Sequence, residues 1–156
     1  MSAGNREITL KDKIQEALKG ALKRQQRVEL STLRLLLSGI KYAEIAQQKP
    51  ADDGKVVDVI AKEVKRRRES IEAFSKGNRA DLVAQEEAEL AVLVSYLPKQ
   101  MSDEEITAAA RQAIDAVGAK GPGDKGKVMA HLMPQVKGKA DGRKVSELVS
   151  ELLAAV

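Results

Sequence analysis

The stretch SYLPKQMSDEE, residues 95–105, decides how this chain folds, because it ends one helix and begins another. Pro98 has no backbone N–H and restricts the residue before it, so a helix arriving from the N-terminal side ends there. Ser102 and Glu105 have the S-x-x-E spacing of a capping box, which predicts a new helix start immediately afterwards. The two predicted domains are residues 1–98 and 101–156.

Upstream of this boundary, apolar residues recur at helical spacing, and no segment shows the strict alternation of a strand. Leu33, Leu36 and Ile40 belong to a broad apolar face, which is typical of a central, well-buried helix. The segment Lys49-Pro50 interrupts the pattern, and Gly77 is a natural helix stop. Four helices are predicted here. The first starts near Thr9, and the other three span about 28–45, 55–74 and 81–97.

Downstream of the boundary, three shorter helices are predicted. Gly118 ends the first, Pro134 is expected to end or kink the second, and Asp141 is a plausible N-cap for the third. The first two span about 103–117 and 125–133. The chain is therefore predicted to be all-α: an N-terminal bundle of about four helices followed by a compact three-helix tail.

The composition excludes several classes of protein. The 156 residues include no cysteine and one histidine, which excludes disulfides, a thiolate nucleophile and the common zinc sites. No stretch reaches the roughly 18 apolar residues of a membrane helix. The N-terminal sequence MSAGNREITL lacks the apolar core of a secretory signal peptide. These features predict a soluble, cytoplasmic protein with no membrane partner.

The sequence offers no self-sufficient active site. Residues 121–127, GPGDKGK, match the start of two phosphate-binding loops, but a predicted helix precedes them and Val128 stands where Ser or Thr would hold Mg²⁺. A flexible connector between helices is the preferred interpretation. His131 has no triad pattern around it and no second histidine for a metal site. We therefore predict no catalytic residue, no metal ligand and no cofactor.

One charged pair falls within the predicted core. On a helical wheel, Arg67 lies inside the apolar stripe of the third helix, and Glu86 lies inside that of the fourth. If these helices form an antiparallel hairpin, the two side chains come within one turn of each other. We predict a structural ion pair between them, with Arg68 and Glu89 at its edge. The alternative is that the stem of Arg67 crosses the stripe and its charge reaches solvent.

Basic residues form two groups that could bind nucleic acid. The net charge is +4, and residues 120–144 contain seven basic and two acidic side chains. Because only three residues are aromatic, binding by base stacking is not expected, and contact with the phosphate backbone should weaken with salt. The alternative interpretation is a solvated surface. The candidates are Lys62, Lys65 and Arg66 in the bundle, and Lys125, Lys127, Lys137, Lys139, Arg143 and Lys144 in the tail.

Several runs of the chain resemble the YqeY-like family. They are KEVKRRRESIEAF at 62–74, YLPKQMS at 96–102, GKVM at 126–129 and MPQVKGKADG at 133–142. The resemblance extends over roughly residues 9–153. The family is in turn similar to the C-terminal region of GatB, a subunit of the tRNA-dependent amidotransferase.

The resemblance implies two all-helical units that engage tRNA, while the amidation chemistry resides in other parts of that enzyme. It also implies a family-level association with carbon–nitrogen ligase activity that uses glutamine as amido-N-donor. The chain itself shows no amidase nucleophile and no ATP site. The contact residues implied by the tail run are Lys127, Lys137, Gly138, Lys139, Ala140, Asp141 and Gly142.

The preferred prediction is a tRNA-binding, amidotransferase-related protein without an active site of its own. A second interpretation is an accessory subunit of an amidation complex, with an amidotransferase or the aminoacyl-tRNA machinery as partner. A third is a protein-interaction module whose basic face meets an acidic protein.

Overall fold

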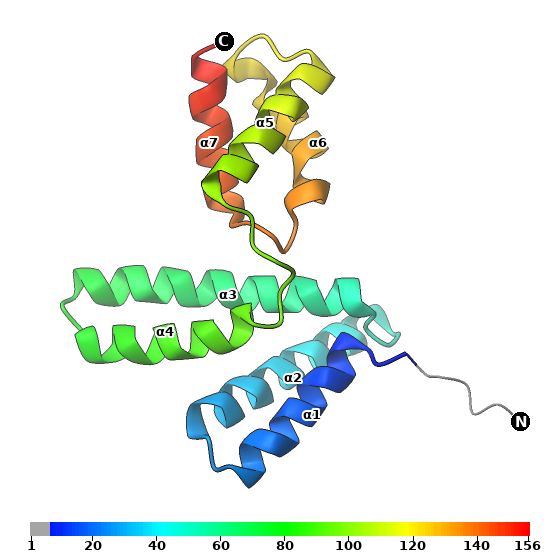
Figure 1. The fold of residues 1–156 in the computed structure, drawn as a ribbon, viewed down its shortest axis with the longest axis vertical. Helices are drawn as coiled ribbons and strands as arrows, with labels where there is room; N and C mark the ends of the chain where they lie inside the picture. Colours follow the sequence, from blue (N-terminus) through cyan, green and yellow to red (C-terminus); the bar gives the residue numbers. More distant parts are fainter. Residues whose placement is uncertain (1–6) are drawn as a thin grey trace, which may run out of the picture. The chain divides into compact units, whose positions relative to one another are not determined.

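The computed structural model describes residues 7–156, and every regular element within them is helical (Figure 1). The predicted all-α class is therefore confirmed for this part of the chain. The described residues divide into two compact units. Unit 1 ends at Leu97, and unit 2 is Pro98–Val156.

Unit 1 consists of two helical hairpins. Helix α1 (Leu10–Lys23) packs against α2 (Arg27–Gln47), and α3 (Asp53–Lys76) packs against α4 (Ala80–Val94), as Figure 1 shows. The helices enclose one apolar core, which stabilises the unit by removing these side chains from water. Its buried residues are Ile14, Leu33, Leu36, Ile40, Val56, Ile60, Val64 and Leu93.

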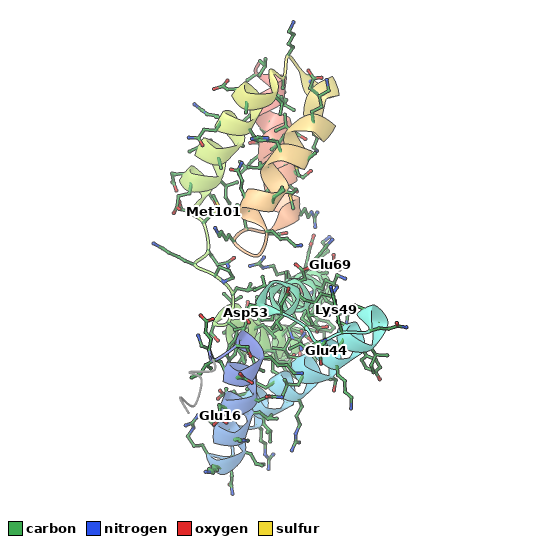
Figure 2. The ribbon with its side chains drawn as sticks, turned by 90° about the vertical axis from the view of Figure 1, so that its right-hand side faces the viewer. Glu16, Glu44, Lys49, Asp53, Glu69 and Met101 are labelled. Atoms are coloured by element: carbon green, nitrogen blue, oxygen red, sulfur yellow. The ribbon has the colours of Figure 1, made fainter. Side chains whose placement is uncertain are left out.

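Two carboxylates tie three helix ends of unit 1 together. Glu44, near the end of α2, accepts a bond from Lys11 Nζ at 2.9 Å and another from the backbone N–H of Ala51 at 2.8 Å. Asp53, in the first turn of α3, accepts from the backbone N–H of Leu10 at 2.9 Å. Figure 2 labels both carboxylates. The start of α1, the end of α2 and the start of α3 are therefore held at one junction.

Helix α4 is shorter than predicted. It ends at Val94, and residues 95–97 form a turn in which Leu97 N–H donates to Val94 O at 3.0 Å. The sequence predicted that the helix would continue to Leu97. The difference arises because Pro98 disfavours helical geometry in the residue before it, so the helix unwinds ahead of the proline.

The predicted core face of α2 is buried, but the helix also has an open face. The helix contacts all three other helices of unit 1, but one face along its length is open. Leu35, Tyr42 and Ile45 are 60%, 74% and 64% exposed. Only the face that carries Leu33, Leu36 and Ile40 lies in the core, because the other helices of a four-helix unit cover α2 on that side alone.

Unit 2 is a three-helix bundle. Helix α5 (Asp103–Val117) is followed by a short 3₁₀ turn, η1 (Pro122–Asp124), then by α6 (Lys125–Val136) and α7 (Gly142–Ala154). A helix therefore precedes the glycine-rich segment, as expected for a connector between helices. The buried core of the unit is Ile106, Ala110, Ala113, Ile114, Val128, Leu132, Val136, Val145, Val149 and Leu153.

Local signals in the sequence place most helix ends of unit 2. Ser102 and Glu105 form the predicted capping box, and Gly118 ends α5 with a left-handed φ of 65°. Asp141 caps α7 by accepting from Arg143 N–H at 3.1 Å. Pro134 does not end α6, which continues to Val136. A proline in the last turn removes only one helical hydrogen bond, and the fully buried Val136 holds that turn in the core.

Candidate nucleic-acid interface

The turn between α6 and α7 carries the lysines of the MPQVKGKADG run. Gly138 has a φ of 73°, in the left-handed region that favours glycine. The N–H groups of Lys139 and Ala140 both donate to Val136 O, at 2.9 and 3.1 Å. Gly138 is buried, whereas Lys137 and Lys139 on either side of it are exposed. The turn is thus closed by backbone hydrogen bonds and exposes the side chains of Lys137 and Lys139.

Residues from the N-terminal segment of unit 2 hold this turn in place. Gln100 Nε2 donates to Gly138 O at 2.9 Å and to Pro98 O at 2.8 Å. The N–H of Met101 donates to Lys139 O at 2.8 Å. Met101 lies before α5 and packs against the core of unit 2 (Figure 2). Because the carbonyls of Gly138 and Lys139 are bonded inward, the turn has a fixed backbone that supports its exposed lysines.

The first turn of α7 adds two exposed cations beside this turn. Arg143 Nε lies 3.5 Å from Glu147 Oε1, and Lys144 Nζ forms an ion pair with Asp103 Oδ1. Both arginine and lysine are at the helix N-terminus, where the macrodipole favours negative charge. We define the "lysine turn" as Lys137, Gly138, Lys139, Arg143 and Lys144. Its two α7 residues already have acidic neighbours, so part of its charge is compensated within the protein.

The structure separates the predicted tail residues into two places. Lys125 and Lys127 lie in the first turn of α6, and the lysine turn follows its last residue. A helix of 12 residues is about 18 Å long, so the two groups are at opposite ends of α6. Lys127 is exposed and Lys125 is half-buried. They do not form one continuous patch with the lysine turn.

Lys62, Lys65 and Arg66 belong to unit 1, where all three are exposed on α3. Arg66 Nη1 lies 3.4 Å from Glu63 Oε1 on the same helix. An exposed pair of this kind contributes little to stability. These residues form a separate basic group from those of unit 2.

The buried ion pair of unit 1 has a different partner from the one predicted. Arg67 is only 7% exposed, its Nη1 donates to Glu63 Oε2 at 2.9 Å, and its Nε lies 3.3 Å from Glu89 Oε2. Within the described residues that Nε makes no hydrogen bond, so its contact with Glu89 is an ion pair only. Glu86 has no ion pair in this part of the chain. The prediction of an inter-helix pair was right for Arg67 and wrong for Glu86.

The register of the α3–α4 hairpin explains this correction. The left-handed residue of the connection is Asn78, with a φ of 56°. Arg67 precedes Asn78 by 11 residues and Glu89 follows it by 11, whereas Glu86 follows it by only eight. At a rise of about 1.5 Å per residue, Glu86 is displaced along the helix axis by roughly 4.5 Å from the level of Arg67.

The shifted titrations of the chain are explained by individual structural contacts. The hydrogen bond from Lys11 holds the pKa of Glu44 below its ordinary value, and the bond from Arg79 does the same for the pKa of Asp81. Burial raises the pKa of Tyr96. These groups lie on different elements and do not converge on one site. Among residues 7–156, no cluster of three or more His, Asp or Glu side chains is arranged to hold a metal ion.

Sequence reasoning missed the two residues that support the lysine turn. Gln100 and Met101 were predicted only to lie at the domain boundary and in the YLPKQMS run, yet they bond to residues 38 positions further along the chain. A glutamine directly after a helix-ending proline is a weak signal for such a contact. None of the helices in the described chain combines the length and apolarity of a membrane span.

Comparison with known proteins gives a family and a set of mitochondrial relatives. A family model described as "Yqey-like protein" matches residues 11–153. "Altered inheritance of mitochondria protein 41, mitochondrial" of Lachancea thermotolerans is 41% identical over 85 residues, which cover 54% of this chain and 46% of the relative. The protein of that name from Pyrenophora tritici-repentis is 30% identical over 146 residues, covering 92% of this chain and 80% of the relative. The protein of that name from Saccharomyces cerevisiae is 30% identical over 130 residues, which cover 79% of this chain and 70% of the relative.

These relatives overturn the predicted cytoplasmic location, because all three are named as mitochondrial proteins. That prediction relied on the lack of cysteine and of an apolar leader. Neither feature separates the cytoplasm from the mitochondrion, since mitochondrial targeting segments are amphipathic and arginine-rich.

The names of the relatives refer neither to RNA nor to amidation. The chain spans about half the length of the Lachancea relative and most of the other two. The family model extends over both units, from the second residue of α1 to the last turn of α7. The chain therefore belongs to the YqeY-like family.

Proposed function

We propose that this chain binds tRNA through the lysine turn of unit 2, and that it is an amidotransferase-related protein without an active site of its own. The observation that carries the proposal is the fixed backbone of the turn. Gln100 and Met101 bond to the carbonyls of Gly138 and Lys139, so the ordering of that backbone is achieved before any ligand arrives. A pre-organised site loses less entropy on binding.

The charges at the helix starts of unit 2 support a phosphate ligand. The first turn of α5 carries Asp103, Glu104 and Glu105, which suit its macrodipole. The first turns of α6 and α7 contain no acidic residue and carry lysine or arginine instead. The start of α6 has no side-chain cap, so its backbone N–H groups and lysines would favour a phosphate. At the start of α7, where Asp141 already accepts from Arg143 N–H, the nearby cations would favour it.

The composition of unit 2 favours recognition of the RNA backbone over recognition of bases. Residues 98–156 include no Phe, Tyr or Trp, so the unit lacks the large aromatic rings on which unpaired bases usually stack. Lysines provide point charges for phosphates with little sequence selectivity. We therefore expect binding that reads the shape of a folded RNA and falls steeply with salt.

Retention of tRNA by the full chain in a mobility-shift assay tests the proposal. We compare the wild type with Lys137→Ala/Lys139→Ala at about 50 mM and about 200 mM salt, the range over which phosphate contacts lose most affinity. The double variant should bind several-fold more weakly at low salt. Its plot of log affinity against log salt should be flatter by about one to two units.

A matched variant separates a local effect from a change of net charge. Lys13→Ala/Lys23→Ala removes two exposed lysines from α1 and should bind as the wild type does. Lys62→Ala/Lys65→Ala tests the α3 group in the same way. Equal loss in every variant would show that binding depends on net charge alone, and no retention of tRNA by the wild type would reject the proposal. Glutamine-dependent amidation by the pure chain would contradict the lack of an active site.

A further inference from the structure

The open face of α2 carries an apolar residue at every seventh position. Val28, Leu35 and Tyr42 recur every seven residues, and Ile45 follows Tyr42 by three. These four side chains are 42% to 74% exposed. An apolar residue every seven positions keeps to one side of a helix with a drift of only about 20° per heptad. The stripe runs along most of α2, and no other helix of unit 1 covers it.

A row of cations runs beside this stripe. Arg27, Arg34 and Lys41 also recur every seven residues, each immediately before a member of the stripe. All three are exposed, and none has an ion-pair partner within residues 7–156. In heptad terms Val28, Leu35 and Tyr42 occupy a positions and Ile45 a d position. The cations occupy the g positions, where charge selects the partner helix. We call the stripe and this row together the "α2 seam".

The other side of the stripe borders a cleft. A cavity of about 430 Å³ lies between α2, α3 and α4. Leu35 and Tyr42 line it from α2, while Glu63, Arg66 and Glu86 line it from the opposite helices. The small residues Ser38 and Gly39 lie between Leu35 and Tyr42 on its wall. Their size leaves room for a side chain to enter beside the aromatic ring.

Charge and composition indicate what covers the seam. A second copy packed with its α2 antiparallel would bring the arginine and lysine rows together, which is unfavourable. Unit 2 offers no apolar counterpart, since its only large exposed apolar residue is the C-terminal Val156. An RNA backbone would satisfy the cations but would leave Leu35 and Tyr42 unused. An acidic, amphipathic helix satisfies both parts.

We propose that the α2 seam is the docking surface for one amphipathic helix of a partner protein, which carries glutamate or aspartate along the flank that faces Arg27, Arg34 and Lys41. Leu35 and Tyr42 are the apolar anchors. Such helix-in-groove recognition uses residues at i, i+3, i+4 and i+7 of the bound helix. The acidic flank determines which partner helix binds and how fast it associates, while burial of Leu35 and Tyr42 supplies most of the affinity. This surface belongs to unit 1, whereas the lysine turn proposed to contact tRNA belongs to unit 2.

A pair of synthetic peptides tests the proposal with the full chain. Each peptide has about three heptads with leucine at positions a and d. One carries glutamate at positions e and g, and the other carries lysine there. Whether the peptide binds parallel or antiparallel to α2, its charged residues then face Arg27, Arg34 and Lys41. Binding is followed by the fluorescence anisotropy of the labelled peptide. The acidic peptide should bind at least about tenfold more tightly than the basic one.

Three variants assign that binding to the α2 seam. Leu35→Ser/Tyr42→Ser should abolish it, and Arg34→Glu/Lys41→Glu should reverse the preference so that the basic peptide binds more tightly. Lys13→Glu/Lys23→Glu on α1 changes the net charge equally and should bind as the wild type does. All six positions are exposed, and thermal unfolding of each variant is the check that it stays folded.

Several outcomes would overturn the proposal. Equal binding of the two peptides, binding of neither, or binding that survives Leu35→Ser/Tyr42→Ser would each do so. If sedimentation shows a dimer that this variant converts to a monomer, the occupant is a second copy. If Arg34→Glu/Lys41→Glu removes tRNA retention while peptide preference stays unchanged, the row belongs to the RNA surface.

Discussion

Arg67 Nε on α3 lies 3.3 Å from Glu89 Oε2 on α4, and this buried contact joins the two helices at equal distances from the Asn78 turn. Glu63 holds the same guanidinium from one turn earlier on α3. The side chains of Glu63 and Glu89 are 18% and 16% exposed, so the charge of Arg67 is balanced mostly within the protein. Breaking such a pair costs more than the pair contributes, because it leaves a buried charge behind.

Glu89→Gln should destabilise the chain by about 1–3 kcal/mol, since Glu63 still compensates part of the charge of Arg67. Urea unfolding monitored by circular dichroism measures the change. Glu86→Gln is the matched control on the same helix and should alter stability by less than about 0.5 kcal/mol. If Glu86→Gln proved as damaging as Glu89→Gln, the register described for this hairpin would be wrong.

Gly138→Ala should destabilise unit 2 by about 1–2 kcal/mol, because a residue with a Cβ is strained at a φ of 73°. Gly126→Ala is the control in the first turn of α6, where an added Cβ meets no atom within 4 Å and alanine favours the helix. That change should leave stability unchanged or raise it by up to about 1 kcal/mol. Thermal melts measure the change in stability of both variants. Equal losses of stability would contradict the role given to the left-handed φ of Gly138.

Gln100→Leu should weaken tRNA retention without changing the charge of the protein. The substitution removes the bond to Gly138 O, so the lysine turn loses one of its two supports. We expect a stability loss of about 1 kcal/mol and a several-fold loss of affinity, with an unchanged slope against salt. Gln112→Leu, at an exposed position on α5, is the control. If Gln100→Leu lowers stability but leaves the affinity for tRNA unchanged, the fixed backbone of the lysine turn is not needed for RNA binding.

The contribution of Glu44 should depend on pH in a defined direction. Its pKa is lowered in the folded chain by the bond from Lys11, so the unfolded chain takes up its proton first as the pH falls. The contribution is therefore complete above the ordinary value of 4.5 and is lost as the pH falls through the lowered folded value. The difference in melting temperature between wild type and Glu44→Gln should be constant near neutral pH and should shrink below about pH 4.5. If the difference in melting temperature between wild type and Glu44→Gln grew as the pH fell, the pKa of Glu44 would be raised by folding and not lowered.

Local chemistry made the helix ends predictable, while contacts between distant segments were not. Ser102, Gly118 and Asp141 act on backbone groups within a few residues, so their roles can be read from spacing alone. Choosing Glu89 over Glu86 required the register of a hairpin, which its turn sets. The bond from Gln100 to Gly138 joins residues 38 positions apart, and no periodicity reports on it.

The separation of the lysines and the exposure of α2 show a further limit of sequence reasoning. Lys127 and Lys137 looked like neighbours in a short basic stretch, yet the helix between them holds them at its two ends. The predicted apolar face of α2, with Leu33, Leu36 and Ile40, is buried, but the sequence did not predict the separate open face that carries Leu35 and Tyr42. A wheel shows which residues share a face, but the number of neighbouring helices determines how many faces are covered.

The bonds from Gln100 and Met101 to the lysine turn also set where the chain can be cut. A fragment that begins at Ser102 would retain α5, α6 and α7 complete with the capping box, and would still lose both supports of the turn. A fragment that begins at Pro98 would keep them. The fixed backbone of the turn therefore depends on two hydrogen bonds from residues outside the three helices, and a truncation at the helix boundary would remove both.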